Sequence, residues 1–507
     1  MRPHRPLIAA FLVLGAIPAG AATTPDQAKA LEEQLQGWFT TNFGKLMKPG
    51  NRPALVTPAG DRYLITVPTG LKREGSGDDL AVTMLANPAE NGRWVFDTVK
   101  LPQPFEYAMT VPTAKEPGQK EAPAPTIIHT KVIAATQDGS GIWDPTFATP
   151  STFKQTMTGI VSTSTGSGVS QTNAIEKSVT EIVMTPVGTD KLNLTSSGTL
   201  TGYGLKMITP DAAGSIDLAA KSGAVSIVIN GMSRDRGAEA MRAMVDLFAA
   251  GVPGVTPPKP GAPPTADPKL SPAGMAALKR LVATLPDLGS SMKVDESVSD
   301  LAVNAMGKTF AASKVGFTMD MKSVSGQLQG VMGLTAQGMV WPDLGLGDLS
   351  KLLPQHVVMR PAVSGISSQD LTDLLNAAVE NGPKAKPEDA AIQTRLLIKG
   401  GTIGLEALEF DTGGATFAAT GTLTIQGSPS GQPVPKNGNA HIVAKDFDKL
   451  VAVVSAQPML AQGMPTLVFV KGLGKQAEGG LVWDLTYDGA KLAVNGTDMS
   501  AMMGGAR

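Results

Sequence analysis

This chain has 507 residues, of which 42% are hydrophobic and 17% are charged, and it contains 57 Gly, 38 Pro and no Cys. Its 43 Lys and Arg nearly balance its 44 Asp and Glu, so the formal net charge is −1. These numbers exclude a small disulfide scaffold, a chain too polar to fold and a basic surface for nucleic acid.

The first 22 residues have the pattern of a secretory signal peptide. Two Arg lie within the first five residues, residues 7–17 are mostly apolar, and small residues occupy positions 19–22. The apolar run is too short to span a bilayer, and no later run reaches spanning length. We therefore expect a signal peptide at residues 1–22 and a mature chain without a transmembrane segment. The periplasm fits best, because an extracellular animal protein of this size would usually carry disulfides.

Residues 23–250 are predicted to form a helix followed by an antiparallel β domain. Thr24 and Pro25 suit the cap and first turn of a helix, and apolar residues recur at helical spacing from Leu31 to Leu46. From Tyr63 onward the apolar period becomes two, and turns follow at intervals too short for crossover helices. We expect the helix to pack on the sheet.

Residues 251–271 contain seven Pro and are predicted to form a semi-rigid linker. Residues 272–507 are predicted to repeat the arrangement, with a helix from Pro272 and then strands. The expected fold class is β-rich α+β, with two halves of curled antiparallel sheet, each flanked by amphipathic helices.

Several strands of the second half alternate apolar and polar residues, which is typical of a sheet covered on one side. The apolar positions are candidates for the lining of an apolar groove: Val315, Phe317, Phe417, Leu423, Ile425, Leu481 and Trp483. A closed core would use the same residues, so this pattern alone leaves both interpretations open.

No linear motif indicates catalysis. A Gly-x-Ser-x-Gly elbow is absent, and residues 302–309 match a phosphate-binding loop only at the final Gly-Lys-Thr. His129, His356 and His441 are scattered through strand-like sequence without the spacing of zinc ligands. We therefore expect no catalytic residue, no metal site and no cofactor.

The segment from Thr394 to Asn495 resembles a family of envelope proteins. The resemblance rests on Arg395-Leu396-Leu397-Ile398-Lys399-Gly400-Gly401, on Ala419-Thr420-Gly421-Thr422-Leu423 and on Leu492-Ala493-Val494-Asn495-Gly496. The segment is similar to YdgA-like and AsmA-like periplasmic proteins of Gram-negative bacteria. The resemblance to the AsmA group implies curled antiparallel sheets with an apolar groove that serves phospholipid or outer-membrane homeostasis. A signal pattern stands here in place of that group's common N-terminal membrane anchor, which does not favour a membrane-bridging role.

We expect a non-enzymatic, soluble periplasmic protein of the cell envelope that handles lipid acyl chains in an apolar β-groove. Its expected partners are phospholipid, or another ligand with an acyl chain, and other envelope proteins. Two alternatives remain open. One is an interaction or scaffold module that docks proteins by strand addition. The other is a hydrolase whose site no linear motif encodes.

Overall fold

The structure is a computed structural model, and it describes most of the chain after residue 22. The described ranges are 23–43, 54–111, 126–145, 149–166, 169–208, 215–249, 272–284, 288–367, 401–427, 433–477 and 479–499, with Gln369, Thr372, Asp373 and Asn376. The expected signal peptide and the Pro-rich linker at 251–271 lie outside these ranges.

Helices are few and short, whereas strands make up most of the described chain. The helices whose bounds are described are α1 (Pro25–Phe43), α2 (Arg234–Ala249), α3 (Pro272–Thr284), α6 (Phe447–Ser455) and α7 (Met464–Leu473), with the 3-10 turns η2 (Glu90–Gly92), η4 (Gly347–Leu352) and η5 (Pro458–Gly463). The strands of the first half are β1 (Leu55–Ala59), β2 (Arg62–Lys72), β3 (Asp79–Pro88), β4 (Trp94–Lys100), β5 (Phe105–Val111), β6 (Thr126–Ile133), β7 (Thr136–Asp144), β8 (Thr149–Gly166), β9 (Val169–Val187), β10 (Lys191–Ile208) and β11 (Ser215–Ser233). The strands of the second half are β12 (Ser291–Ala305), β13 (Lys308–Val324), β14 (Gln327–Gln337), β15 (His356–Ser367), β16 (Gly401–Thr412), β17 (Ala415–Gly427), β18 (Pro433–Lys445), β19 (Lys475–Ala477), β20 (Gly480–Tyr487), β21 (Leu492–Val494) and β22 (Thr497–Asp498). No helix within the described ranges is long and apolar enough to cross a bilayer.

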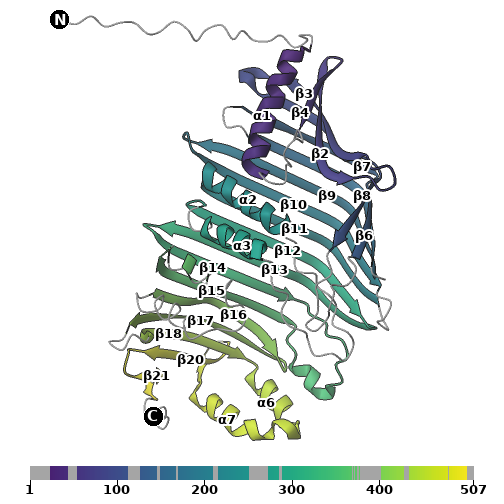
Figure 1. Cartoon of the computed structure of the whole chain (residues 1–507). Coiled ribbons are helices and arrows are strands. Elements are labelled where there is room, and N and C mark those ends of the chain that lie inside the picture. The colour runs from purple at the N-terminus through teal and green to yellow at the C-terminus, as the bar shows by residue number, and fades with distance from the viewer. Residues whose placement is uncertain are drawn as a thin grey trace, which may run out of the picture.

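All described strands belong to one antiparallel sheet, which curls without closing (Figure 1). From β8 to β18 each strand pairs with the next along the chain, and β20 follows β18. At the N-terminal end, β7 and β6 pair with different parts of the long strand β8. This meander confirms the β-rich α+β class.

The expected division into two halves is not confirmed. Strands β11 and β12 flank the Pro-rich linker in sequence, yet they pair directly, from Ile216 opposite Ala305 to Asn230 opposite Ser291. The sheet is therefore continuous across the position where two sheets were expected. Loop closure explains this outcome, because its free-energy cost grows only slowly with loop length, so a long linker can still connect neighbouring strands.

Helix α1 packs on the N-terminal part of the sheet, as expected. Thr24 caps it, because its Oγ1 accepts a hydrogen bond from the backbone N–H of Gln27 at 3.3 Å. Leu31 and Leu35 are buried in one cluster with Tyr63 of β2. The apolar face of this amphipathic helix therefore packs against the sheet and is buried there.

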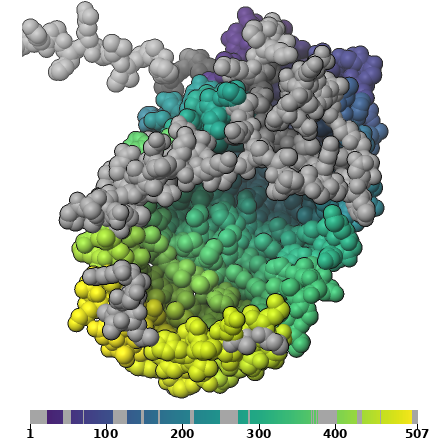
Figure 2. Space-filling model, turned by 60° about the horizontal axis from the view of Figure 1, so that its bottom comes forward, coloured from purple at the N-terminus to yellow at the C-terminus, as the bar shows by residue number. Residues whose placement is uncertain are grey.

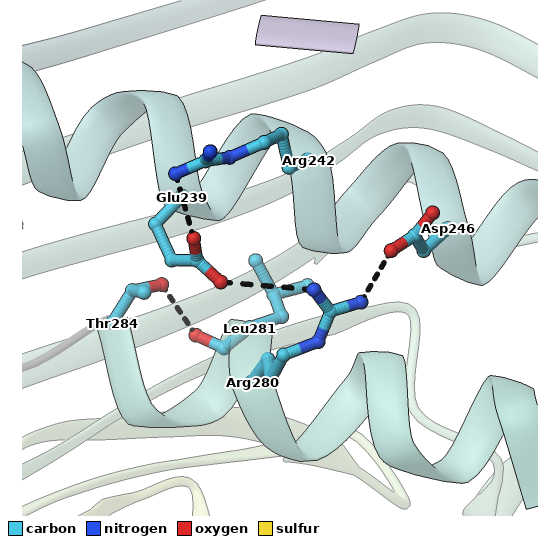
Figure 3. A network of polar contacts seen from close by, with 6 residues as sticks. All are labelled: Glu239, Arg242, Asp246, Arg280, Leu281 and Thr284. Atoms are coloured by element: carbon cyan, nitrogen blue, oxygen red, sulfur yellow. Dashed lines mark hydrogen bonds and ion pairs between the residues drawn. The ribbon is translucent and has the colours of Figure 1, made fainter. Parts of the chain in front are cut away.

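Helices α2 and α3 lie side by side on the same face of the sheet (Figure 1). Figure 3 shows the polar contacts between them: Arg280 reaches Glu239 at 3.7 Å and Asp246 at 2.5 Å, and Glu239 also pairs with Arg242 at 2.8 Å. Because these side chains are partly exposed, each ion pair contributes about 1 kcal/mol or less. The apolar contacts beneath, including Leu281, provide the larger contribution.

Helix α6 covers the C-terminal part of the sheet. It lies at the strand ends opposite to those from which α2 and α3 extend. Phe447, Leu450 and Val454 are buried against β17, β18 and β20. The indole N–H of Trp483 in β20 donates a hydrogen bond to the carbonyl of Val470 in α7 at 2.9 Å. The buried apolar residues therefore form separate clusters beneath these helices.

A row of left-handed residues crosses the long strands. Gly159, Gly202, Asp300 and Gly338 have φ of 55°, 60°, 49° and 59°, and the register places them in alternate strands β8, β10 and β12 and just after β14. Lys221 of β11 lies between two of them and pairs with Asp300 at 3.7 Å. Because a left-handed residue interrupts the pleat of an extended strand, this row marks a bend across the sheet.

Candidate functional site

One face of the sheet is apolar over most of its width. A cross-strand row of paired residues, which we call the central row, shows this best: Val225, Glu296, Phe317, Leu334, Met359, Leu408, Ala419, Ile442 and Trp483. Glu296 is the only charged residue in this row. The neighbouring row that runs from Ile182 through Ile227, Val294 and Met319 to Met332 carries no charge. Helices α1, α2, α3 and α6 pack on this same face, so it is the inner face of the curled sheet.

At the N-terminal end, α1 and α2 cover a cavity of about 690 Å³ on this inner face. Its lining is rich in aromatic side chains from α1 and strands β4, β7 and β8: Trp38, Phe39, Trp94, Phe96, Trp143 and Phe153. The charged residues in this lining, Asp190, Arg234 and Asp235, lie near the start of α2, whereas Thr41, Asn42 and Thr149 add uncharged polar groups elsewhere. The volume lies within the range of small-molecule sites, about 300–1,000 Å³.

At the C-terminal end, the inner face forms a groove of about 580 Å³. Its lining comes from β15 to β18, β20 and β21 and is made largely of aliphatic residues and glycines, among them Leu405, Leu408, Leu423 and Leu485. Figure 2 shows the hollow that the sheet encloses, with the C-terminal elements in yellow along its rim. None of the described residues that line this groove is charged.

Within the C-terminal groove and in the strands before it, the inner face exposes large apolar side chains. Met332 is 50% exposed, Leu334 47%, Ile403 44% and Met359 38%. Leu334 and Met359 are direct partners across β14 and β15, and Ile403 pairs with Leu423 in the groove. Contiguous exposed apolar surface of this kind marks a binding surface or a ligand groove, whereas single exposed residues need no explanation.

The outer face is polar and carries the histidines of the second half. His441 Nδ1 lies 2.6 Å from Asp484 Oδ1, and His356 Nε2 lies 3.7 Å from Glu409 Oε2. His129 contacts Glu74 at 2.6 Å near the N-terminal end of the sheet. Each histidine therefore contacts a single carboxylate, and within the described ranges no three His, Cys, Asp or Glu side chains cluster in a way that could hold a metal ion.

The seven predicted groove residues divide among three environments. Leu423 lines the C-terminal groove. Val315 and Phe317 lie on the inner face in β13, paired with Ala336 and Leu334. The remaining predicted residues are in closed packing instead.

The closed packing lies mainly beneath α6. Phe417 stacks on Phe410 with ring centroids 4.9 Å apart, and Leu481 and Trp483 are buried in the same cluster. Ile425 is buried near the end of β17. The shared apolar face is therefore observed, but only part of it is open.

Sequence reasoning missed the aromatic cavity and the exposed residues of β14 to β16. Met332 and Leu334 are two residues apart in one strand, so they share a face, but Val331 and Gly333 beside them are not polar, and the alternation that marks a half-covered strand is weak here. The aromatic cavity had no such signal, because Trp94 and Trp143 meet only through the pairing of β4 with β7. Comparison with protein-family models, with curated proteins and with solved structures finds no match to this chain.

Proposed function

We propose that this protein is a non-enzymatic protein of the cell envelope that holds lipid acyl chains against the inner face of its curled sheet. The observation that carries this proposal is the exposed apolar surface of Met332, Leu334, Met359 and Ile403, which joins the C-terminal groove. A folded protein in water gains free energy when an apolar ligand covers such a surface.

The dimensions of the groove fit one acyl chain. The groove crosses neighbouring strands from β15 to β20, which at 4.7–4.9 Å per strand gives a length of about 19 Å. The acyl chains of one bilayer leaflet span about 15 Å, half of the hydrocarbon core. An extended chain can therefore lie across the strands with most of its length in contact with apolar side chains.

The chemistry of the inner face also suits an acyl chain. The described lining of the groove presents aliphatic carbons and glycine backbone without a charge, and the same face carries methionines in the neighbouring strands, Met332 in β14 and Met319 in β13. Methionine side chains are flexible and adapt to ligands of different shape. This lining favours chains of varied length over a single rigid ligand.

The location within this proposal is the periplasm. It is supported by the signal-peptide pattern at residues 1–22 and by the absence of Cys. The resemblance to AsmA-like envelope proteins points to the same class of ligand, phospholipid. The curled antiparallel sheet with an apolar inner face is the architecture that the resemblance implies.

A titration with a fatty acid that carries a polarity-sensitive fluorophore tests the proposal. We expect saturable binding that added phospholipid reverses. Ile403→Asp places a carboxylate in the groove and should weaken binding at least tenfold, because an uncompensated charge is costly under an apolar ligand. Thr402→Asp adds the same charge on the outer face and should leave binding unchanged. Absence of saturable binding by protein shown to be lipid-free would contradict the proposal.

A further inference from the structure

The segment formed by η5 and α7 presents an apolar surface to solvent at the rim of the hollow. Met459 is 83% exposed, Val468 57%, Phe469 45% and Val470 36%. The sixteen residues from Pro458 to Leu473 include one charged residue, Lys471, which pairs with Asp448 of α6. This surface, which we call the α7 surface, consists of Met459, Val468, Phe469 and Val470.

The arrangement of these residues fits a lipid surface better than a protein groove. Val468, Phe469 and Val470 are consecutive, so their side chains point about 100° apart around the helix. A helix that docks into a protein groove uses a stripe at i, i+3, i+4 and i+7. A helix that is apolar on several sides at once suits a fluid hydrocarbon environment.

The α7 surface is continuous with the groove of the proposed function. The residues packed beneath α6 and α7 include Ile442 and Leu485, and the same two residues line the C-terminal groove. Figure 2 shows these C-terminal elements, in yellow, forming part of the rim of the hollow. An acyl chain that leaves a bilayer at α7 would therefore meet apolar side chains along its path into the groove.

The charges beside the α7 surface are compatible with anionic head groups. Lys475 begins β19 with one residue between it and the end of α7, Lys445 ends β18, and both are exposed. Lys449 and Lys471 lie near them, each paired with an Asp of the α6 region. Apolar residues flanked by Lys are typical of segments that rest in the interface of an anionic membrane.

We propose that the α7 surface docks on an anionic lipid bilayer and thereby brings the mouth of the groove to the membrane. This inference deepens the proposed function and rests on it, because docking places the groove where acyl chains enter it. The occupant is a lipid surface, and a second copy of this chain or another protein would be a different outcome.

Flotation with vesicles of phosphatidylcholine and phosphatidylglycerol tests the inference on the full chain. We expect the wild type to float with anionic vesicles, and Met459→Asp and Phe469→Asp to lower the bound fraction at least tenfold, because each moves a carboxylate into the apolar contact. Val324→Asp is the matched control: Val324 is 52% exposed at the opposite strand ends, and this change should leave flotation unchanged.

The fluorescent fatty acid in vesicle-free solution separates this inference from the proposed function. The α7 variants should bind the probe as the wild type does, because they leave the groove intact. Equal flotation of wild type and both α7 variants, or no flotation of a wild type that binds the probe, overturns the docking inference alone. A wild type that sediments as a dimer and becomes a monomer on Met459→Asp also overturns it, since a second copy then covers the surface.

Discussion

Truncation of Met332 and Leu334 to Ala should weaken the binding of an acyl chain, and the exposed fractions of the two side chains give the size of the loss. Full burial of a Leu or Met side chain contributes about 1.5–3 kcal/mol. Because these two side chains are 50% and 47% exposed, an acyl chain that covers both gains about 2 kcal/mol. Most of this is lost on truncation, so the affinity should fall about tenfold to thirtyfold.

The assay is a fluorescence titration of wild type and the double variant with the same fatty-acid probe. Thr335→Ala is the matched control, because Thr335 is adjacent in β14 and lies on the opposite face. Denaturant unfolding should show that the double variant stays folded, with a loss of about 1–2 kcal/mol from the parts of the two side chains that are already buried. Unchanged probe affinity in a folded double variant would refute the assignment of the inner face as the binding surface.

Three further predictions concern the fold. Gly202→Ala should destabilise the protein by about 1–2 kcal/mol in denaturant unfolding, because its φ of 60° is strained for a residue with a Cβ, whereas Gly204→Ala, with nothing within 4 Å, should be close to neutral. Cleavage at a protease site inserted in residues 251–271 should leave two fragments that co-elute in size-exclusion chromatography, since β11 pairs with β12; separate elution would contradict the continuous sheet. Two backbone N–H groups, those of Ala490 and Lys491, hold the pKa of Asp488 below its ordinary value of 3.8, so its stabilisation is present above that pH and is lost as the pH falls through the lowered value. Asp488→Ala should therefore lower Tm at pH 7 and differ less from wild type below pH 3.8, and a Tm difference that does not shrink there would contradict this role.

Strand periodicity was sufficient to predict the apolar face. Val315, Phe317 and Leu423 lie on one side of the sheet, as their alternation with polar residues indicates. Periodicity cannot show which part of such a face a helix covers. Phe417 and Trp483 have the same strand pattern as Leu423 but lie beneath α6, because covering depends on where the chain returns after β18.

The Pro-rich linker shows a second limit of sequence reasoning. Its composition predicts a semi-rigid linker, but composition says nothing about which strands pair on either side of it. The pairing of β11 with β12 includes apolar pairs such as Ile227 opposite Val294 and Ile229 opposite Met292, but it also places Val225 opposite Glu296. Likewise, the pairing that places Trp94 opposite Trp143 joins segments separated by two other strands, which no local pattern encodes.

The most direct test of acyl-chain binding is covalent mapping of the bound chain. A fatty acid with a photoreactive diazirine on its acyl chain is bound to the protein and irradiated, and mass spectrometry locates the modified residues. We predict modification of inner-face residues, above all Leu334, Met359 and Ile403, and none at Thr335 of the outer face. Labelling spread equally over both faces, or labelling that excess phospholipid does not suppress, would contradict the proposal that the inner face holds acyl chains.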